Sequence, residues 1–143
     1  GRGGNILTPF ICACERGHMN DVDQFMNLHP FHAYINMDVA EGSMDVTSLM
    51  IAALEEHTNI LEYLLQHDAD VSITNSYGKN ALHYAARNNT TNTNIIQLLL
   101  NKMSLNDINH KDEDEETPLD TCYYNNNSSI KQDIITLIRK HGG

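Results

Sequence analysis

Cysteine and histidine lie close together near the start of the chain, where they could bind a metal ion. Cys12 and Cys14 are followed by His18. Zinc-binding cysteines usually occur as C-x2-C pairs with matching histidines, whereas a C-x-C pair on a helix points its side chains about 200° apart. We therefore expect no metal site here. Cys14, like Cys122, is interpreted as a small buried apolar residue.

His83 is the residue whose type most invites a catalytic interpretation. A nucleophile activated by histidine needs a close partner in space and an oxyanion hole. The sequence offers neither a glycine-rich nucleophile elbow nor a phosphate-binding loop. We therefore predict that the protein is not an enzyme and that it uses no cofactor.

The densest charge in the chain is acidic. Residues 112–116 read Asp-Glu-Asp-Glu-Glu, with Lys111 beside them. Such a run is either a solvated loop or an electrostatic contact for a basic partner. The 143 residues contain 9 Lys+Arg and 19 Asp+Glu, a formal charge of −10, which argues against binding to nucleic acid or to anionic membranes.

Length and composition favour a monomeric, single-domain, intracellular protein of the cytoplasm or nucleus. With 41% hydrophobic residues the chain can form a core, and no apolar run approaches the roughly 18 residues of a membrane span. Three cysteines are too few for a disulfide scaffold. The start, Gly-Arg-Gly-Gly, lacks a methionine and a signal peptide, so a piece of a longer protein is one interpretation.

The elements that position these residues follow from an internal repeat. Four units begin at Thr8, Thr47, Asn80 and Thr117, which are 39, 33 and 37 residues apart. Each start can cap a short helix, and each unit continues with a second apolar stretch, as at residues 60–65, 95–100 and 134–138. Helices shorter than about 12–15 residues are not stable alone, so the units must stack.

Between the units the sequence predicts finger-like loops. Residues 70–73 alternate in polarity, and residues 75–78 (Asn-Ser-Tyr-Gly) predict a tight turn. We expect a hairpin-like finger there, projecting from the stack.

These motifs resemble those of ankyrin-repeat domains. The family shows a Thr-Pro-Leu-His motif, a Gly-His pair between helices and a Leu-Leu-x-x-Gly-Ala-Asp end. Its counterparts here are Thr8-Pro9-Phe10, Gly17-His18, Asn80-Ala81-Leu82-His83, residues 64–71 and Thr117-Pro118-Leu119. The resemblance covers about residues 4–142. It implies that His83 is structural, bonding near the start of its helix with Asn80 as partner.

The resemblance implies an all-α repeat solenoid of paired antiparallel helices with β-hairpin-like fingers. We predict one ankyrin-repeat domain over residues 1–143, with repeats at about 4–38, 39–75, 76–112 and 113–143. Extra residues near 29–32, 38–44, 88–94 and 125–132 are expected in loops. The last unit keeps apolar residues at 134, 135, 137 and 138, which suggests an uncapped array that continues further.

In the ankyrin family the concave face, built from fingers and first helices, binds protein partners. Transfer of that face predicts these exposed candidates on fingers: Met44, Asp45, Tyr77, Lys79, Asp112, Asp114 and Glu115. On first helices and the turns after them it predicts Ile51, Glu55, Tyr84, Arg87, Asn88, Tyr124 and Asn125. Tyrosine and arginine are good interface anchors, and we expect Tyr77, Tyr84, Arg87 and Tyr124 to line one strip.

Three functions are open at this point. The first is a protein-interaction scaffold or adaptor that binds a segment with basic and apolar residues. The second is a regulatory or targeting domain of a larger protein, such as an enzyme, a channel or a host-directed effector. The third is an acidic inhibitor of a basic partner, whose binding would depend strongly on salt.

Overall fold

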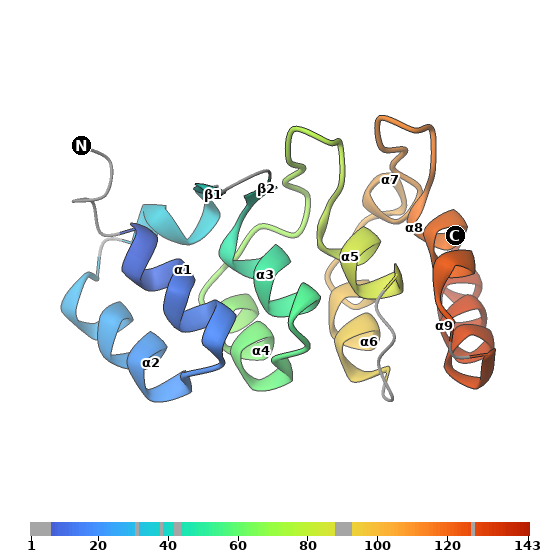
Figure 1. Cartoon of the computed structure of the whole chain (residues 1–143). Helices are drawn as coiled ribbons and strands as arrows, with labels where there is room; N and C mark the ends of the chain where they lie inside the picture. The colour runs from blue at the N-terminus through green and yellow to red at the C-terminus, as the bar shows by residue number, and fades with distance from the viewer. Residues whose placement is uncertain (1–6, 31, 38, 42–43, 88–92, 127) are drawn as a thin grey trace. The chain divides into compact units, whose positions relative to one another are not determined.

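The computed structural model describes residues 7–30, 32–37, 39–41, 44–87, 93–126 and 128–143 (Figure 1). The chain divides into two compact units, Gly1–Asp70 and Val71–Gly143. Helices packed in pairs make up most of each unit, as expected for an all-α repeat fold (Figure 1). The single domain and the four repeat boundaries stay predictions.

The described residues of the first unit form two helix pairs and a pair of short strands. Its elements are α1 (Leu7–Arg16), α2 (Met19–Leu28), the 3-10 helix η2 (His32–Asn36), β1 (Val39–Glu41), β2 (Met44–Val46), α3 (Ser48–Leu54) and α4 (Thr58–Gln66). The two strands are antiparallel, with Val39 opposite Val46. Gly17, with a φ of +76°, makes the turn between α1 and α2, as its Gly-His motif predicts.

The second unit contains a helix pair, two short helices and a long last helix. Its elements are α5 (Ala81–Arg87), α6 (Asn94–Leu100), α7 (Leu105–Ile108), α8 (Pro118–Thr121), the 3-10 helix η3 (Cys122–Tyr124) and α9 (Ser128–Lys140). The sequence prediction missed α7. Its signal was the capping box formed by Ser104 and Asp107.

Side-chain caps start the helices α3 and α8 where the sequence predicts them. The expectation that Thr8 caps a helix is wrong, because Thr8 is already the second residue of α1. The Thr47 hydroxyl oxygen accepts the backbone N–H of Met50 at α3. At α8, Thr117 and Asp120 form a reciprocal capping box, and Pro118 occupies the first helical position. A cap of this kind is worth about 1 kcal/mol, which matters for helices of four to seven residues.

The core consists of aliphatic residues from the second helices packed against small residues of the first helices. Ile60, Leu61 and Leu64 of α4 are fully buried, and Ala52 and Ala53 of α3 are at most 1% exposed. Small side chains allow helices to approach closely, which is why each unit needs both kinds of residue.

Two of the three cysteines belong to the core, as predicted. Cys14 and Cys122 are fully buried. Burial raises the pKa of Cys14 to about 12 and that of Cys122 to about 11. Both are therefore neutral thiols at physiological pH, which is poor chemistry for a nucleophile or a metal ligand.

The second unit carries two finger loops, defined here as residues 75–79 (first) and 112–116 (second). In the first, the side-chain oxygen of Asn75 accepts the backbone N–H groups of Tyr77 (3.1 Å) and Lys79 (3.0 Å). The N–H of Gly78 donates to the Asn75 carbonyl at 2.9 Å, and Gly78 has a φ of +73°. The predicted tight turn is therefore confirmed.

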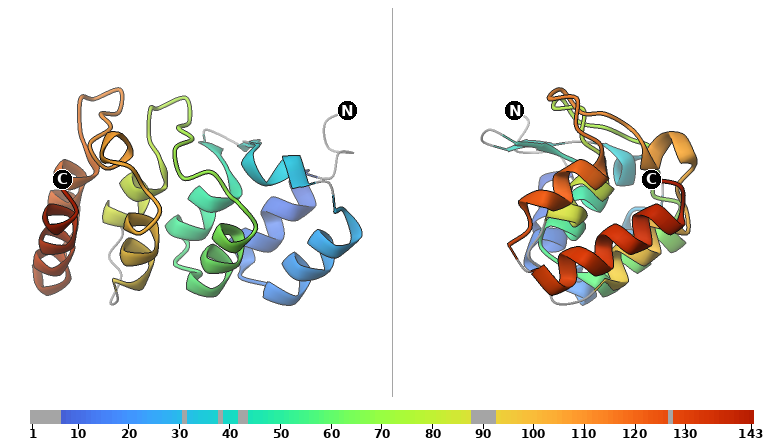
Figure 2. Two further views of the ribbon diagram at one scale, coloured as in Figure 1. Left: turned by 180° about the vertical axis from the view of Figure 1, so that it is seen from behind. Right: turned by 90° about the vertical axis from the view of Figure 1, so that its right-hand side faces the viewer.

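The second finger loop repeats this arrangement with different residues. The Oδ1 atom of Asp112 accepts the N–H groups of Asp114 (2.9 Å) and Glu116 (3.0 Å). Glu115 donates to the Asp112 carbonyl at 3.0 Å and has a φ of +63°, the left-handed conformation that Gly78 has in the first loop. In both views of Figure 2 the two loops project in the same direction from the helices of the second unit.

One expectation about the last repeat is wrong. Residues 125–132 are not an inserted loop, because α9 begins at Ser128. The isoleucines at 134, 135 and 138 are buried within the second unit, at 0%, 6% and 0% exposure, whereas Leu137 is partly exposed. That the array continues further stays a prediction. The predicted insertion at 88–94 falls mostly on residues 88–92, which lie outside the described residues.

Glu115→Gly is expected to stabilise the protein by about 0.5–1 kcal/mol, because glycine adopts a positive φ without the Cβ clash of other residues. Urea denaturation of the 143-residue chain measures the change. Glu113→Gly is the control: Glu113 has no positive φ, so glycine there adds only unfolded-state entropy and lowers stability. Equal effects of the two substitutions would contradict the role of Glu115.

Candidate functional site

The surface that the sequence predicts in the second unit is built on the start of α5. The side-chain oxygen of Asn80 accepts the N–H groups of Leu82 (3.0 Å) and His83 (3.2 Å), which caps the helix. His83 is 1% exposed. Its Nδ1 lies 3.1 Å from the backbone nitrogen of Asn80, and its Nε2 lies 3.0 Å from the carbonyl oxygen of Glu116.

One protonation state of His83 satisfies these two contacts; Nδ1 also lies 3.1 Å from the side-chain oxygen of Asn80. With the proton on Nε2, the ring donates to the Glu116 carbonyl and accepts the Asn80 N–H through Nδ1. Burial lowers the pKa of His83, although the Glu116 carbonyl and the charge of Asp112 act in the opposite direction. His83 is thus a structural link between α5 and the second finger loop, with Asn80 as its partner, as predicted.

Asp112 is a structural residue and not an exposed contact. The prediction of its exposure is wrong, since Asp112 is only 4% exposed. Its Oδ2 lies 2.5 Å from the Nζ of Lys79. Burial alone would raise the pKa of Asp112, but the Lys79 ammonium and the N–H groups of Glu116 and Asp114 lower it below its usual value.

The backbone also joins the two finger loops. Glu113 donates its N–H to the Tyr77 carbonyl at 3.0 Å. A Cβ on Gly78 would lie 3.1 Å from both the Asp112 Cα and the Glu113 nitrogen, so any larger residue would crowd the backbone of the second finger loop. The loops therefore form one fixed platform next to α5.

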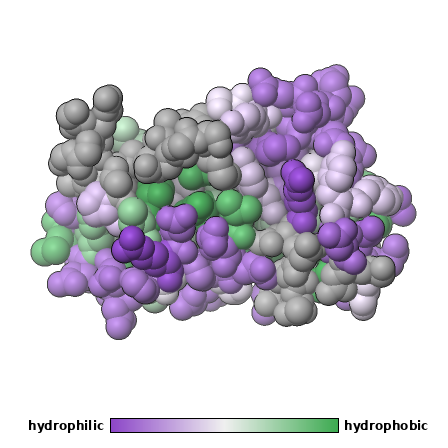
Figure 3. Space-filling model, viewed as in Figure 1, coloured by the Kyte–Doolittle hydropathy of each residue, from purple (hydrophilic) through white to green (hydrophobic). Residues whose placement is uncertain are grey.

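Exposed aromatic and charged side chains surround this platform. Tyr77 and Tyr124 are 39% and 53% exposed, Arg87 is exposed and Tyr84 is partly buried. These four residues, all in the second unit, are called the aromatic strip below. Figure 3 shows a largely hydrophilic surface over the neighbouring finger loops.

Short contacts hold three members of the aromatic strip. The Tyr124 hydroxyl donates to Glu116 Oε2 at 2.7 Å, and the Arg87 Cζ lies 5.4 Å from the centroid of the Tyr124 ring. The Tyr84 hydroxyl accepts the side-chain N–H of Asn75 at 2.6 Å. The structure therefore brings Arg87, Tyr124 and Glu116 together, and the sequence prediction had not included Glu116.

Other predicted residues have different locations. Ile51 and Asn125 are 5% and 1% exposed, so the prediction of their exposure is wrong. Glu55 is exposed in the first unit, while Asp114 and Glu115 are exposed on the second finger loop. Met44 and Asp45 belong to β2 of the first unit, and their side chains, like all of Asn88, lie outside the described residues.

The second finger loop also contains a cluster of carboxylates. Ligand atoms of Asp112, Asp114 and Glu116 lie within 4.8 Å of one another. Both oxygens of Asp112 already have partners, since Oδ2 binds Lys79 and Oδ1 accepts two backbone N–H groups. Asp112 is therefore already engaged by the Lys79 ammonium and by the backbone of its own loop.

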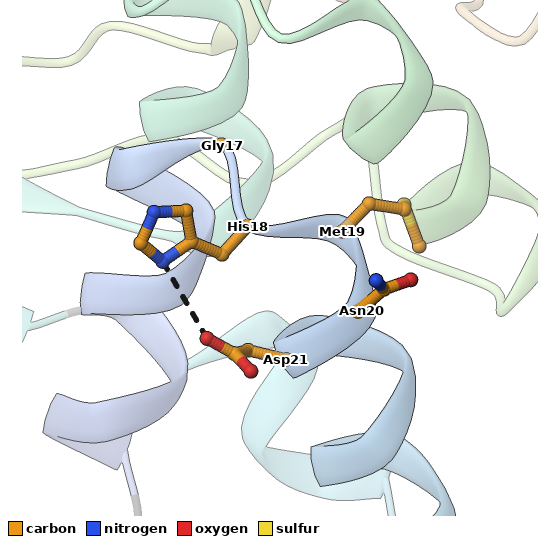
Figure 4. Close-up of a pocket in the computed structure, with 5 residues that line it drawn as sticks. All are labelled: Gly17, His18, Met19, Asn20 and Asp21. Atoms are coloured by element: carbon orange, nitrogen blue, oxygen red, sulfur yellow. Dashed lines mark ion pairs between the residues drawn. The ribbon is translucent and has the colours of Figure 1, made fainter.

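A hollow in the first unit contains the histidine of the predicted cysteine–histidine group. Gly17, His18, Met19, Asn20 and Asp21 line about 480 Å³ of open space (Figure 4). The Nδ1 of His18 lies 3.4 Å from Asp21 Oδ2, so the ring is held by a carboxylate. With Cys14 buried, the group has no second available thiol that could complete a zinc site.

The comparison with protein families agrees with the repeat pattern. Residues 2–75 and 49–142 match the sequence model of a family described as "Ankyrin repeats (3 copies)". Within the part of the chain that the structure describes, no helix has the length and apolar character needed to cross a membrane.

The burial of neutral His83 predicts acid sensitivity. Its folded-state pKa is below 6.5, so the unfolded chain binds the proton more readily, and stability falls as the pH drops below about 6.5. One proton contributes a slope of at most about 1.4 kcal/mol per pH unit. Denaturation between pH 7.5 and 5 should show a shallower slope for His83→Gln than for the native chain. A ring pKa of 6.5 or above for His83, measured by NMR, would contradict this account.

Proposed function

The chain belongs to the ankyrin-repeat family, and from this premise we propose that it binds a partner protein through the aromatic strip of its second unit. Ankyrin repeats are in general protein–protein interaction modules. The proposal adds the surface, which consists of Tyr77, Tyr84, Arg87 and Tyr124 beside the two finger loops.

One observation carries the proposal: exposed tyrosine rings stand on a platform that internal bonds hold in place. Tyr77 and Tyr124 bring large apolar area at 39% and 53% exposure. The backbone bond from Glu113 to Tyr77 and the hydroxyl bond from Tyr124 to Glu116 fix their surroundings. A surface that is already ordered loses little conformational entropy on binding.

The charge around the strip favours a partner with basic residues. Asp114, Glu113 and Glu115 are exposed, and Glu116 is partly buried. Lys79, which is only 20% exposed, is neutralised by Asp112. In a partner segment that alternates basic and apolar residues, the basic side chains would pair with these acids and the apolar side chains would pack on the tyrosine rings of the strip.

The role in the cell is proposed as that of an intracellular, monomeric adaptor without enzymatic activity. A regulatory or targeting domain of a larger protein is compatible with the same surface. The acidic-inhibitor alternative differs in its salt dependence, because it relies on screened attraction more than on aromatic contacts.

Tyr77→Ala combined with Tyr84→Ala is expected to weaken partner binding by about 1 kcal/mol or more without unfolding the chain. The partner is first captured from a lysate, identified by mass spectrometry, and then measured as a purified protein by calorimetry. Tyr123→Ala is the matched control, because Tyr123 is 56% exposed but not part of the strip.

Unchanged affinity of the double variant, with native circular dichroism, would show that the strip is not the interface. Calorimetry at two salt concentrations tests the inhibitor alternative. Affinity that barely changes between them would exclude it.

A further inference from the structure

We propose that the Tyr124 ring and the Glu116 carboxylate form a receptor for an arginine side chain of the partner, and that Arg87 occupies the ring of this receptor in the free protein. The proposal rests on the proposed function, because it names the chemistry recognised at the same surface. The occupant to which it commits is an extended protein segment with an exposed arginine.

The structure already shows a guanidinium at this place. The Arg87 Cζ lies 5.4 Å from the Tyr124 ring centroid, within the range of a cation–π contact. Arg87 is exposed at the end of α5 and Tyr124 is 53% exposed, so solvent and a partner can reach both. The Tyr124 ring is thus open to a planar cation and already has one next to it.

The carboxylate of this receptor is held in position before binding. The Tyr124 hydroxyl donates to Glu116 Oε2 at 2.7 Å. That bond, with the negative charge of Glu116, raises the pKa of Tyr124, so the hydroxyl stays protonated and keeps donating at neutral pH. The backbone of Glu116 is fixed as well, by His83 at its carbonyl and by Asp112 at its N–H.

Arginine fits this pair better than lysine. A guanidinium is planar, so it stacks on an aromatic ring while its N–H groups donate to a carboxylate, whereas an ammonium is a compact, strongly hydrated charge. Neighbouring acids attract either cation. The charge of Asp114 acts on Tyr124 in the same direction as that of Glu116. The preference for arginine must therefore come from the ring and the oriented carboxylate.

Arg87 competes with the incoming arginine. A partner guanidinium that takes the Tyr124 ring and Glu116 must displace Arg87 or share the ring with it. Removal of Arg87 should therefore strengthen the binding of an arginine-containing segment. If Arg87 were instead an anchor for acidic or apolar groups of the partner, its removal would weaken binding.

The test uses the full 143-residue chain and two capped eight-residue peptides, one alternating arginine with leucine and one alternating lysine with leucine. NMR titration measures both dissociation constants and reports shifts at the Tyr124 and Glu116 amides. We expect the arginine peptide to bind roughly two- to fivefold tighter than the lysine peptide.

Two pairs of variants test the residues of the receptor. Glu116→Gln should abolish the preference for arginine, whereas Glu115→Gln, which removes the same charge from the same loop, should keep it. Arg87→Ala should tighten arginine-peptide binding roughly two- to fivefold and raise the preference over lysine. Lys140→Ala removes one positive charge from the exposed end of α9 and should leave the preference unchanged.

The outcomes separate this inference from the proposed function. Weaker binding after Arg87→Ala, or equal effects of Glu116→Gln and Glu115→Gln, would overturn the arginine receptor. No preference for arginine would also overturn it. In each of these cases the proposed function is still supported if substitution of Tyr77 and Tyr84 weakens the binding of a captured partner. If those substitutions leave the affinity unchanged, the proposed function itself is overturned.

Discussion

Lys79 and Asp112 form the contact on which the arrangement of the second unit depends. Two oppositely charged groups are taken largely out of water, the Asp112 side chain to 1% exposure and the Lys79 side chain to 20%. Such burial is costly unless each charge is paired and the remaining lone pairs are bonded. Here Oδ2 of Asp112 binds the Lys79 ammonium and Oδ1 accepts two backbone N–H groups. Asp112, although part of an acidic run, therefore has a structural role.

The remaining parts of the site follow from this contact. With Asp112 fixed, the second finger loop presents its Glu116 carbonyl to His83 and its Glu113 N–H to Tyr77. The Glu116 side chain then faces the Tyr124 hydroxyl. The acidic run therefore divides in two: Asp112 holds the loop, while its exposed neighbours Glu113, Asp114 and Glu115 give the loop a negative surface.

The sequence predicted the repeat, the caps and the tight turn because each depends on local chemistry. Thr47, Thr117 and Asn80 cap helices through their own side chains, and the turn at residues 75–78 is specified by its own asparagine and glycine. The burial of Asp112 could not be predicted in this way, because its partner Lys79 is 33 residues away in the sequence and a run of acids does not show which one faces it. Asp112 occupies the position in the second finger loop that Asn75 occupies in the first, and this equivalence was the available signal for its structural role.

The central claim is that the two finger loops are held together by the Lys79–Asp112 pair. A double-mutant cycle with Lys79→Met and Asp112→Asn tests it most directly, because an asparagine side chain keeps an acceptor for the backbone N–H groups while the charge is removed. From urea denaturation of the four proteins we predict a coupling free energy of about 1–3 kcal/mol. A coupling below about 0.5 kcal/mol, the usual limit of additivity for independent sites, would contradict the account.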